Sequence, residues 1–492
     1  MKKFNHQQGS ILIQAIVFGS IAVLLLNTLG AWAGTNVKAS RQASNRETAI
    51  QIAEAGIDYY RWHLAHAPQD YRDGTGVAGP YTHNFKDKDG NIIGQFILDI
   101  TPPPLGSTLV TIKSTGKINA DPSISRSATT KLAKPSLAKY SLVSNSDMRF
   151  GEGTEVFGPV HSNGGIRFDG VAHNIVSSTK TNYTDPDHTG GNEFGVHTHV
   201  NAPPGAGVNN TFRPNEAPPS ATPSRTDVFL AGRQFPVPAV DFTGLVSDLS
   251  QIKTDAIANG KYYAASGGLG YYILLKTNDT FDIYRVNSLI SIGGACATNA
   301  TTAVQPGWGT WSINTTGGSK TLIASNVSFP ANGLIFTEDN LWIDGQINTA
   351  RLTIAAATFP DSAATRRSIT VNNDLLYSNY GGQDVLSLIA QNNVNVGLKS
   401  LDTLRIDAAM IAQNGRIGRF YYSSNCGTGY VRDTLTLYGM LATNGRYGFA
   451  YSNNTGYTNR NLIYDANLLY GPPPSFPLTS DQYSIISWDE TN

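Results

Sequence analysis

The sequence predicts a mainly β protein that begins with one long α-helix, and three observations lead to this prediction. An uncharged apolar run over 10–37 continues into a segment with helical spacing that no proline interrupts before Pro68. After Pro68, apolar and polar residues alternate with the period of a β-strand. A short apolar motif that ends in Asn-Gly or Asn-Asn also recurs in the second half of the chain.

The apolar run over 10–37 contains no Asp, Glu, Lys or Arg. At about 1.5 Å per residue, a helix of this length crosses a bilayer, so we expect the chain to enter a membrane through residues 10–37. Helical spacing then continues past the run, on one face formed by Ala39, Ala43, Ile50, Ala53, Ile57, Tyr60 and Leu64. The prediction is one helix over 10–67.

A cleaved secretory signal is an alternative for this end of the chain. Lys2 and Lys3 then form the basic region, 24–29 the apolar region, and Ala31-Trp32-Ala33 the cleavage site. The apolar run is long for a signal, and a cleaved signal has no use for a helix that continues past the cut. The sequence alone leaves three possibilities open: cleavage after Gly9, cleavage after Ala33, and no cleavage.

The motif Gln7-Gln8-Gly9, followed by Ser10-Ile11-Leu12-Ile13 and a helix that ends in Ala-Glu-Ala-Gly-Ile at 53–57, resembles a type IV prepilin. The resemblance is to the minor, PilX-like kind and covers about the first 67 residues, with 1–9 as the leader. It implies that a prepilin peptidase cuts between Gly9 and Ser10. It also implies a protein anchored in the inner (cytoplasmic) membrane, with its bulk outside the cytoplasm, or packed with other pilin-like subunits in a surface filament.

One position departs from the pilin pattern. Pilins usually carry glutamate at the fifth position after the cut, and this chain has Gln14. A carboxylate at that position pairs with the terminal ammonium of a neighbouring subunit, and this attraction is strong in apolar surroundings. Gln14 accepts a hydrogen bond but carries no charge. This fits either a subunit at the filament tip or a pilin-like protein that acts outside any filament.

Residues 68–137 have the pattern of a small antiparallel sheet. Strands over 81–85 and 92–100 flank the turn sequence Asp87-Lys88-Asp89-Gly90-Asn91, and strands over 108–114 and 124–132 follow. Packing of the long helix on such a sheet is the α+β layout of a pilin head.

Residues 138–492 form a β-rich ectodomain in this prediction, and an internal repeat is the main observation. The segment 409–418 recurs as 439–448, in shortened form as 388–393, and more weakly as 160–164. Short strands that end in sharp turns at such intervals predict the stacked rungs of a β-solenoid, similar to a parallel β-helix. A β-sandwich gives the same local pattern and is the alternative.

Two segments interrupt this region. Residues 201–224 are rich in proline and predict an extended loop or linker. Residues 241–259 predict a helix, and strands over 271–276 and 280–286 predict a hairpin. We interpret 241–287 as a helix-hairpin insertion beside the solenoid.

Several histidines lie close together in one part of the ectodomain. The acidic residues Asp187 and Glu193 lie in the same segment. His197 and His199 fall on the same face of a strand, a spacing that metal sites use. A polar, exposed loop has the same composition and is the simpler interpretation. No cofactor is predicted apart from this metal ion, for which the candidate ligands are His161, Asp185, His197 and His199. His173 and His188 are the other histidines of the segment.

The composition excludes some classes of function. With 36 basic and 36 acidic residues the net charge is zero, which gives no reason to expect nucleic-acid binding. Cys296 and Cys426 are the two cysteines, so one disulfide is possible. The sequence has no Gly-x-Ser-x-Gly, no phosphate-binding glycine loop and no Cys-x-x-Cys, so we do not predict an enzyme. The alternative is a secreted or anchored β-solenoid enzyme that acts on polysaccharide.

Aromatic residues suggest a binding role instead. Trp308 and Trp311 are candidates for a platform that contacts surface polysaccharide or a host or partner cell. Strands commonly bury aromatic rings, so these residues also fit a core. The predicted function is a minor or tip pilin-like protein in type IV pilus assembly or surface adhesion.

Overall fold

The computed structural model describes residues 8–242, 249–300, 309–314 and 318–491, and the chain forms two compact units. The first, here called the head, contains 1–102, 110–133 and 482–492; the second, here called the large β unit, contains 103–109 and 134–481. The predicted boundary at 137/138 missed the return of the chain to the head. The reason is that a single exposed strand at the C-terminus carries no apolar pattern that reveals its partner.

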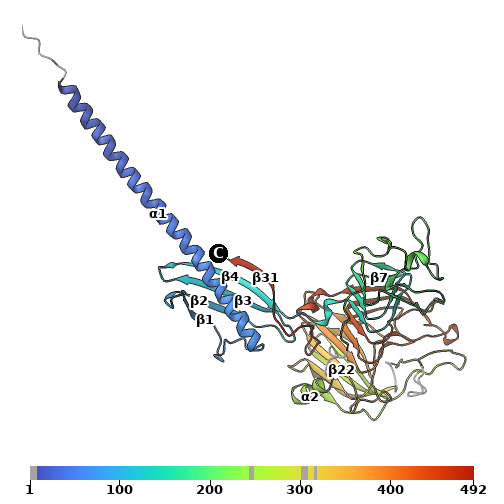
Figure 1. Cartoon of the computed structure of the whole chain (residues 1–492). Coiled ribbons are helices and arrows are strands. Elements are labelled where there is room, and N and C mark those ends of the chain that lie inside the picture. Colours follow the sequence, from blue (N-terminus) through green and yellow to red (C-terminus); the bar gives the residue numbers. More distant parts are fainter. Residues whose placement is uncertain (1–7, 243–248, 301–308, 315–317, 492) are drawn as a thin grey trace, which may run out of the picture. The chain divides into compact units, whose positions relative to one another are not determined.

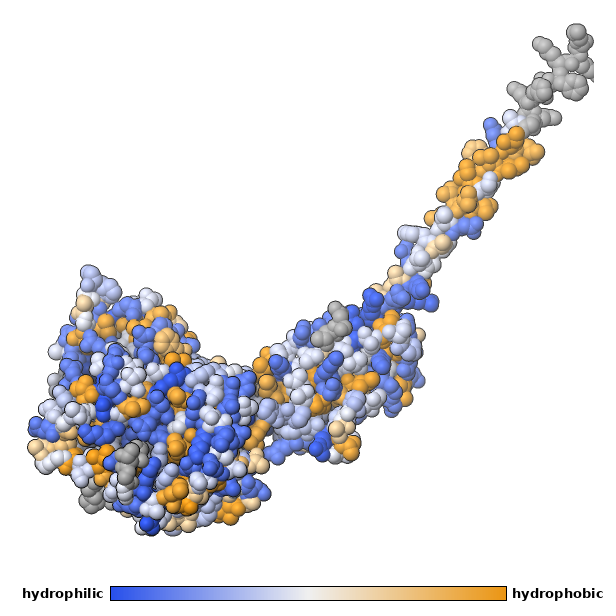
Figure 2. Space-filling view, turned by 180° about the vertical axis from the view of Figure 1, so that it is seen from behind, coloured by the Kyte–Doolittle hydropathy of each residue, from blue (hydrophilic) through white to orange (hydrophobic). Residues whose placement is uncertain are grey.

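Helix α1 spans Gln8–His66 without interruption and confirms the predicted long helix. An 18-residue window in it has a mean hydropathy of 2.2, and none of that window is buried. Figure 2 shows apolar residues covering this exposed part of the helix. Ser10 and Gln14 lie in this exposed part of α1, and the Gln14 side chain is exposed. By length and composition, α1 is therefore able to cross a membrane.

The other end of α1 packs on an antiparallel sheet with the strand order β1-β2-β3-β4-β31 (Figure 1). The predicted hairpin forms, and Asp87 accepts hydrogen bonds from the backbone N–H groups of Asp89 and Asn91 in its turn. The buried face of α1 is part of the predicted one, since Ile57, Tyr60 and Leu64 are buried. The strands are β1 (Tyr81–Lys86), β2 (Ile92–Thr101), β3 (Val110–Ile118), β4 (Asp121–Ala133) and β31 (Ser484–Thr491).

Glycines set the close approach of helix and sheet in the head. A Cβ atom on Gly116 of β3 would overlap the carbonyl oxygen of Ala49 and lie 2.7 Å from the backbone nitrogen of Ala53. A Cβ on Gly56 of α1 would likewise overlap Ser114. Backbone therefore meets backbone here, which a larger residue prevents.

The large β unit is built mainly from parallel strands, and most of its described strands fall into three columns. The first column runs β16 (Lys261–Tyr263), β20 (Leu334–Thr337), β22 (Arg351–Ala356), β25 (Val385–Ala390), β27 (Thr403–Ala412), β29 (Val431–Thr443), β5 (Leu142–Ser144), β8 (Val160–Ser162), β11 (Val176–Ser178) and β15 (Arg233–Gln234).

The second column shares β27 and β29 with the first, and part of the third column shares β21 with the second. The second is β17 (Gly270–Lys276), β21 (Leu341–Ile347), β24 (Leu375–Tyr377), β27, β29, β30 (Gly456–Tyr464), β7 (Thr154–Val156) and β10 (Val171–Ala172). The third has β21, β23 (Ile369–Thr370), β26 (Val394–Val396) and β28 (Ile417–Arg419), and separately β6 (Met148–Phe150), β9 (Ile166–Phe168) and β14 (Val196–His197).

The order of strands in the first column differs from their order in the chain. From β5 to β15 the chain moves along the column in one direction, and it then continues at β16, the strand at the other end. From β16 it proceeds strand by strand toward the middle of the column. There β29 pairs with β5, and Leu441 lies beside Leu142. Two stretches of chain therefore meet in the middle of one column.

Three of the sequence repeats occupy neighbouring strands. Leu388 lies beside Met410, as their alignment requires, while Met410 lies beside Leu441 rather than Met440. The strands are thus shifted by one residue relative to the sequence repeat. Gly439 accompanies this shift, because it has a φ of 139° and its missing Cβ leaves room for the carbonyl oxygen of Ala408.

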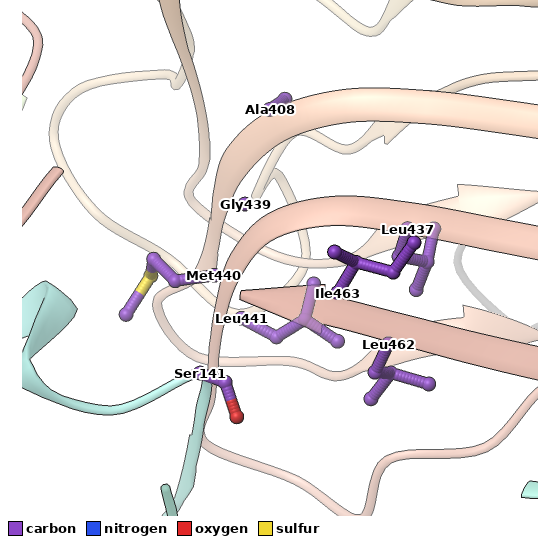
Figure 3. Close-up of a pocket in the computed structure, with 8 residues that line it drawn as sticks. All are labelled: Ser141, Ala408, Leu437, Gly439, Met440, Leu441, Leu462 and Ile463. Atoms are coloured by element: carbon purple, nitrogen blue, oxygen red, sulfur yellow. The ribbon is translucent and has the colours of Figure 1, made fainter. Parts of the chain in front are cut away.

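A small cavity lies beside Gly439, where the strands are shifted (Figure 3). Its volume is about 10 Å³, the size of one water molecule. It is lined mainly by aliphatic side chains and contains no carboxylate; the lining residues are Ser141, Ala408, Leu437, Gly439, Met440, Leu441, Leu462 and Ile463. This cavity is a packing gap rather than a substrate site.

The predicted helix-hairpin insertion is integrated into the large sheet rather than packed beside it. Helix α2 (Leu249–Asn259) follows residues 243–248, which lie outside the described part of the chain. Strand β17 forms the predicted hairpin with β18 (Thr280–Val286), but it also pairs in parallel with β21. Strand β19 (Lys320–Ser328) extends this antiparallel edge. The sequence could not reveal the pairing of β17 with β21, because it joins strands far apart in the chain.

Candidate metal centre

A cluster of histidines and carboxylates lies in an irregular part of the large β unit. Strands β12 (Asn182–Tyr183) and β13 (Glu193–Phe194) form a short antiparallel pair, and their connecting loop carries Asp185 and His188. Glu193 belongs to β13 and His197 to β14, which pairs in parallel with β9. His199 is the second residue after the end of β14. Short strands and one tight loop therefore bring five donor residues together.

The donor atoms converge on one point. Oε2 of Glu193 lies 2.8 Å from Nε2 of His188, 3.1 Å from Nε2 of His197 and 3.2 Å from Nε2 of His199. Oδ2 of Asp185 lies 3.4, 3.6 and 3.9 Å from the same three nitrogens. The five side chains are at most 5% exposed.

The other ring nitrogen of each histidine is held by a backbone carbonyl. Nδ1 of His188 lies 3.2 Å from the carbonyl oxygen of Thr189. Nδ1 of His197 lies 3.2 Å from that of Phe194, and Nδ1 of His199 lies 2.6 Å from that of Asn209. A carbonyl oxygen only accepts hydrogen bonds, so each Nδ1 carries the proton. In the neutral ring, Nε2 is then a lone pair, and all three lone pairs point into the cluster.

Further buried groups support the cluster from outside. Arg167 of β9 is fully buried, and it donates to Oδ2 of Asp169 at 2.7 Å and to Oδ2 of Asp185 at 3.5 Å. Asp169 in turn accepts a hydrogen bond from the backbone N–H of His199 at 2.8 Å. The charges of Arg167 and Asp169 balance each other, which leaves those of Asp185 and Glu193 for the centre.

Burial and the neighbouring charges shift the pKa values of Asp185, Glu193 and His197 in opposite directions. Burial acts to raise the pKa of the Asp185 and Glu193 carboxyls, but the neighbouring His197 and backbone N–H groups outweigh it, and both pKa values are lowered. Burial acts to lower the pKa of His197, yet the two carboxylates raise it above its usual value. Both carboxyls are therefore ionised at neutral pH.

The structure changes the predicted ligand set. Asp185, His197 and His199 lie in the cluster, but His161 does not. Nδ1 of His161 contacts the Ser177 hydroxyl at 3.0 Å, and burial lowers the pKa of this histidine. His161 and the cluster lie on different columns, which spacing in the chain does not indicate.

His188 and Glu193 complete the cluster, although the predicted set omitted them. The spacing Glu193-x-x-x-His197-x-His199 is the signal that identifies Glu193. Residues 189–192 are exposed, as in the loop interpretation, but Asp185, Glu193, His197 and His199 are buried. Asp187 points elsewhere and forms an ion pair with Arg446.

The proline-rich segment 201–224 is an ordered loop and not a linker. Val200 and Val208 form an antiparallel bridge, which brings Asn209 to His199. The backbone N–H of Arg213 donates to Oε1 of Glu193 at 2.8 Å. Both ends of the loop belong to the large β unit, and the loop closes one side of the cluster.

The other predicted sites have different environments. Cys296 and Cys426 form a disulfide with a Cα–Cα distance of 4.3 Å. Trp311 is buried against Trp342, and its ring N–H donates to the carbonyl of Ala300 at 3.0 Å, so it cannot serve as a binding platform. Trp308 lies outside the described residues.

The sequence was compared with protein families, curated proteins and solved structures. No protein-family model matches the sequence, and no curated protein matches it. Among solved structures, the chain is similar to the competence-associated pilin ComZ from Thermus thermophilus, at 12% sequence identity and a TM-score of 0.32. The alignment covers 91% of this chain and 98% of that chain.

Proposed function

We propose that this chain is a minor or tip pilin-like protein of a type IV pilus system, anchored by α1 and carrying the large β unit for assembly or adhesion at the cell surface. The observation that carries the proposal is the division of α1 into two parts. One part is apolar and exposed, and the other is buried on the antiparallel sheet of the head. An exposed apolar helix needs a membrane or other apolar helices around it. The helix of a pilin is surrounded first by the membrane and later by the helices of neighbouring subunits in the filament.

The disulfide supports a location outside the cytoplasm. Cys296 and Cys426 lie within bonding distance, and disulfides persist in oxidising compartments. This orientation places the end of α1 before Ser10 on the cytoplasmic side, where a prepilin peptidase cuts after Gly9. The partners in this proposal are that peptidase, other pilin-like subunits, and a surface polysaccharide or partner cell.

The parallel columns support a β-solenoid as the architecture of the large β unit. A β-sandwich is built from antiparallel sheets, whereas the pairings from β20 to β29 are parallel. The large β unit leaves the head after β4 and returns to it at β31, so it is an insertion into the pilin-like sheet. An insertion of this size favours a single displayed subunit over a repeating one.

N-terminal sequencing of the mature protein from its native membrane tests the proposal. We expect the chain to begin at Ser10. A start at Gly34 contradicts it, because the apolar part of α1 is then removed. An intact Met1 contradicts the prepilin part of the proposal and leaves a plain membrane anchor.

The charge at position 14 tests the place in the filament. Gln14→Glu restores the carboxylate that pairs with the ammonium of a neighbouring subunit. If this chain sits at a tip, we expect the variant to appear along the filament shaft in immunogold labelling, while Gln14→Asn remains at the tip. Unchanged labelling of Gln14→Glu contradicts the argument for a tip position.

A further inference from the structure

We propose that His188, His197, His199, Glu193 and Asp185 bind one divalent transition-metal ion of the zinc class, which fastens the 182–213 segment to the large β unit. This site does not depend on the proposed pilus function.

In the neutral rings, the Nε2 lone pairs of the cluster face the carboxylate oxygens, and the 2.8 and 3.2 Å contacts of His188 and His199 with Glu193 are hydrogen bonds only when those rings are doubly protonated. Backbone carbonyls fix the protons of His188, His197 and His199 on Nδ1, so each Nε2 directs a lone pair at the carboxylates. Carboxylate oxygens are also acceptors. A cation at the centre turns these mutual repulsions into bonds, and a divalent ion balances the two carboxylate charges while the three rings stay neutral.

One ring nitrogen provides independent evidence. Nε2 of His197 is buried, and its side chain is 0% exposed. It lies 3.1 Å from Oε2 of Glu193, but this nitrogen has no hydrogen-bond partner. A buried polar atom without a partner is costly, and here it points toward the other four donors. A metal ion satisfies it.

The distances suit a metal. Ligand atoms around a tetrahedral zinc ion lie about 3.3 Å apart, given bonds of about 2.0 Å. The distances from the Nε2 atoms to Glu193 and Asp185 run from 2.8 to 3.9 Å. One donor atom each from Asp185, His188, Glu193 and His199 also lies within 4.8 Å of the others. The distances from the three Nε2 atoms to the two carboxylates therefore lie within about 0.6 Å of the tetrahedral value.

The donor set selects the metal class. Three imidazoles favour zinc, nickel, copper or iron over calcium and magnesium, which prefer oxygen ligands. The site is also closed, because the side chains of the ligands are at most 5% exposed. Catalytic zinc sites keep an open position for water or substrate, and structural sites do not. The metal therefore has a structural role.

The ligands explain what the metal holds together. Asp185 and His188 come from the β12–β13 loop, and His197 lies on β14, which pairs in parallel with β9 in the third column. Asn209 and Arg213 connect the proline-rich loop to the same ligands. One ion thus joins an irregular segment to regular strands.

The test uses the full-length protein purified in detergent and stripped with a chelator. We expect it to take up one equivalent of Zn²⁺, with a rise in Tm, and to show no such response to Ca²⁺. In His199→Gln we expect the affinity for Zn²⁺ to fall at least about 100-fold. The matched control is His173→Gln, since His173 belongs to the same stretch of chain but is partly exposed beside Glu155. We expect the control to bind Zn²⁺ as the unchanged protein does.

Three results overturn the proposal: no Zn²⁺ uptake by the unchanged protein, equal uptake by His199→Gln, or tighter binding of Ca²⁺ than of Zn²⁺. If His199→Gln does not fold, X-ray absorption of the unchanged Zn²⁺-loaded protein decides. Imidazole scattering from about three histidines at about 2.0 Å supports the site. A spectrum with oxygen ligands and no histidine overturns it.

Discussion

The head and the large β unit each contain a strand pairing between distant parts of the chain, β31 with β4 and β29 with β5, and these two pairings are buried to different degrees. In the head, β31 pairs with β4, and the described side chains of β31 are mostly exposed. In the large β unit, β29 pairs with β5, and Leu441 and Leu142 are buried at this junction. The hydrophobic effect therefore stabilises the second junction far more than the first.

This difference teaches how an insertion of this size is accommodated. The large β unit interrupts the head sheet between β4 and β31, so the chain must return to complete that sheet. A weakly buried edge strand adds hydrogen bonds to a head that already has its core, formed by α1 with β2, β3 and β4. By contrast, the junction of β29 and β5 lies inside the main core of the large β unit.

The largest expected effect comes from breaking the buried junction. Leu142→Ala removes a fully buried side chain that pairs with both Leu441 and Val160. We expect the free energy of unfolding of the large β unit to fall by about 4 kcal/mol. Urea unfolding of the full-length protein measures this loss. Leu401→Ala is the control, because Leu401 is 39% exposed, and we expect a loss below about 1 kcal/mol. Equal losses contradict a buried junction.

Removal of the disulfide comes next and tests a covalent link between distant parts of the large β unit. Cys296 and Cys426 are separated by 130 residues, so their bond restricts a long loop of the unfolded chain. We expect Cys296→Ser with Cys426→Ser to lower the free energy of unfolding by about 3 kcal/mol. Thermal unfolding with and without reductant checks this. The double variant should not respond to reductant, and any response contradicts the assignment.

A smaller effect is expected from separating helix and sheet in the head. Gly116→Val places a side chain against the backbone of α1 at Ala49 and Ala53. We expect a loss of about 2 kcal/mol in the stability of the head, because backbone atoms cannot move aside as a side chain can. Lys117→Val, the exposed neighbour on the same strand, is the matched control. Hydrogen exchange at β3 measures both, and a similar increase in the two variants argues against close packing at Gly116.

Deletion of β31 gives the smallest effect and sharpens the comparison directly. We expect removal of 484–492 to cost about 1 kcal/mol, mainly through lost hydrogen bonds to β4. Amide exchange should increase in β4 and remain unchanged in β29. A loss as large as that of Leu142→Ala shows that β31 is a core strand, and the comparison of the two junctions then fails.

Local sequence patterns predicted where the helices and strands lie better than they predicted which strands pair with each other. The helix over 10–67 and the hairpin around Asp87 depend on contacts within short stretches of sequence, and both match the structure closely. The pairing of β17 with β21 and the return of β31 to β4 involve strands with ordinary β patterns. Such patterns state that a strand exists but not which strand it meets.

The candidate metal centre shows the same division. The sequence placed Asp185, His197 and His199 near one another and marked a metal-like spacing. It also suggested His161, which the fold directs toward Ser177, and it left out His188 and Glu193. Only the turn between β12 and β13 decides which of these side chains face inward.

By itself, the sequence determined the long apolar helix, the small antiparallel sheet and the prevalence of short strands, because helical and strand periods are properties of neighbouring residues. The tertiary structure decided that two stretches of chain meet at β29 and β5, that the C-terminus rejoins the head, and that Asp185, His188, Glu193, His197 and His199 converge. These features depend on burial and pairing between residues far apart in the chain, and spacing along the sequence does not contain that information.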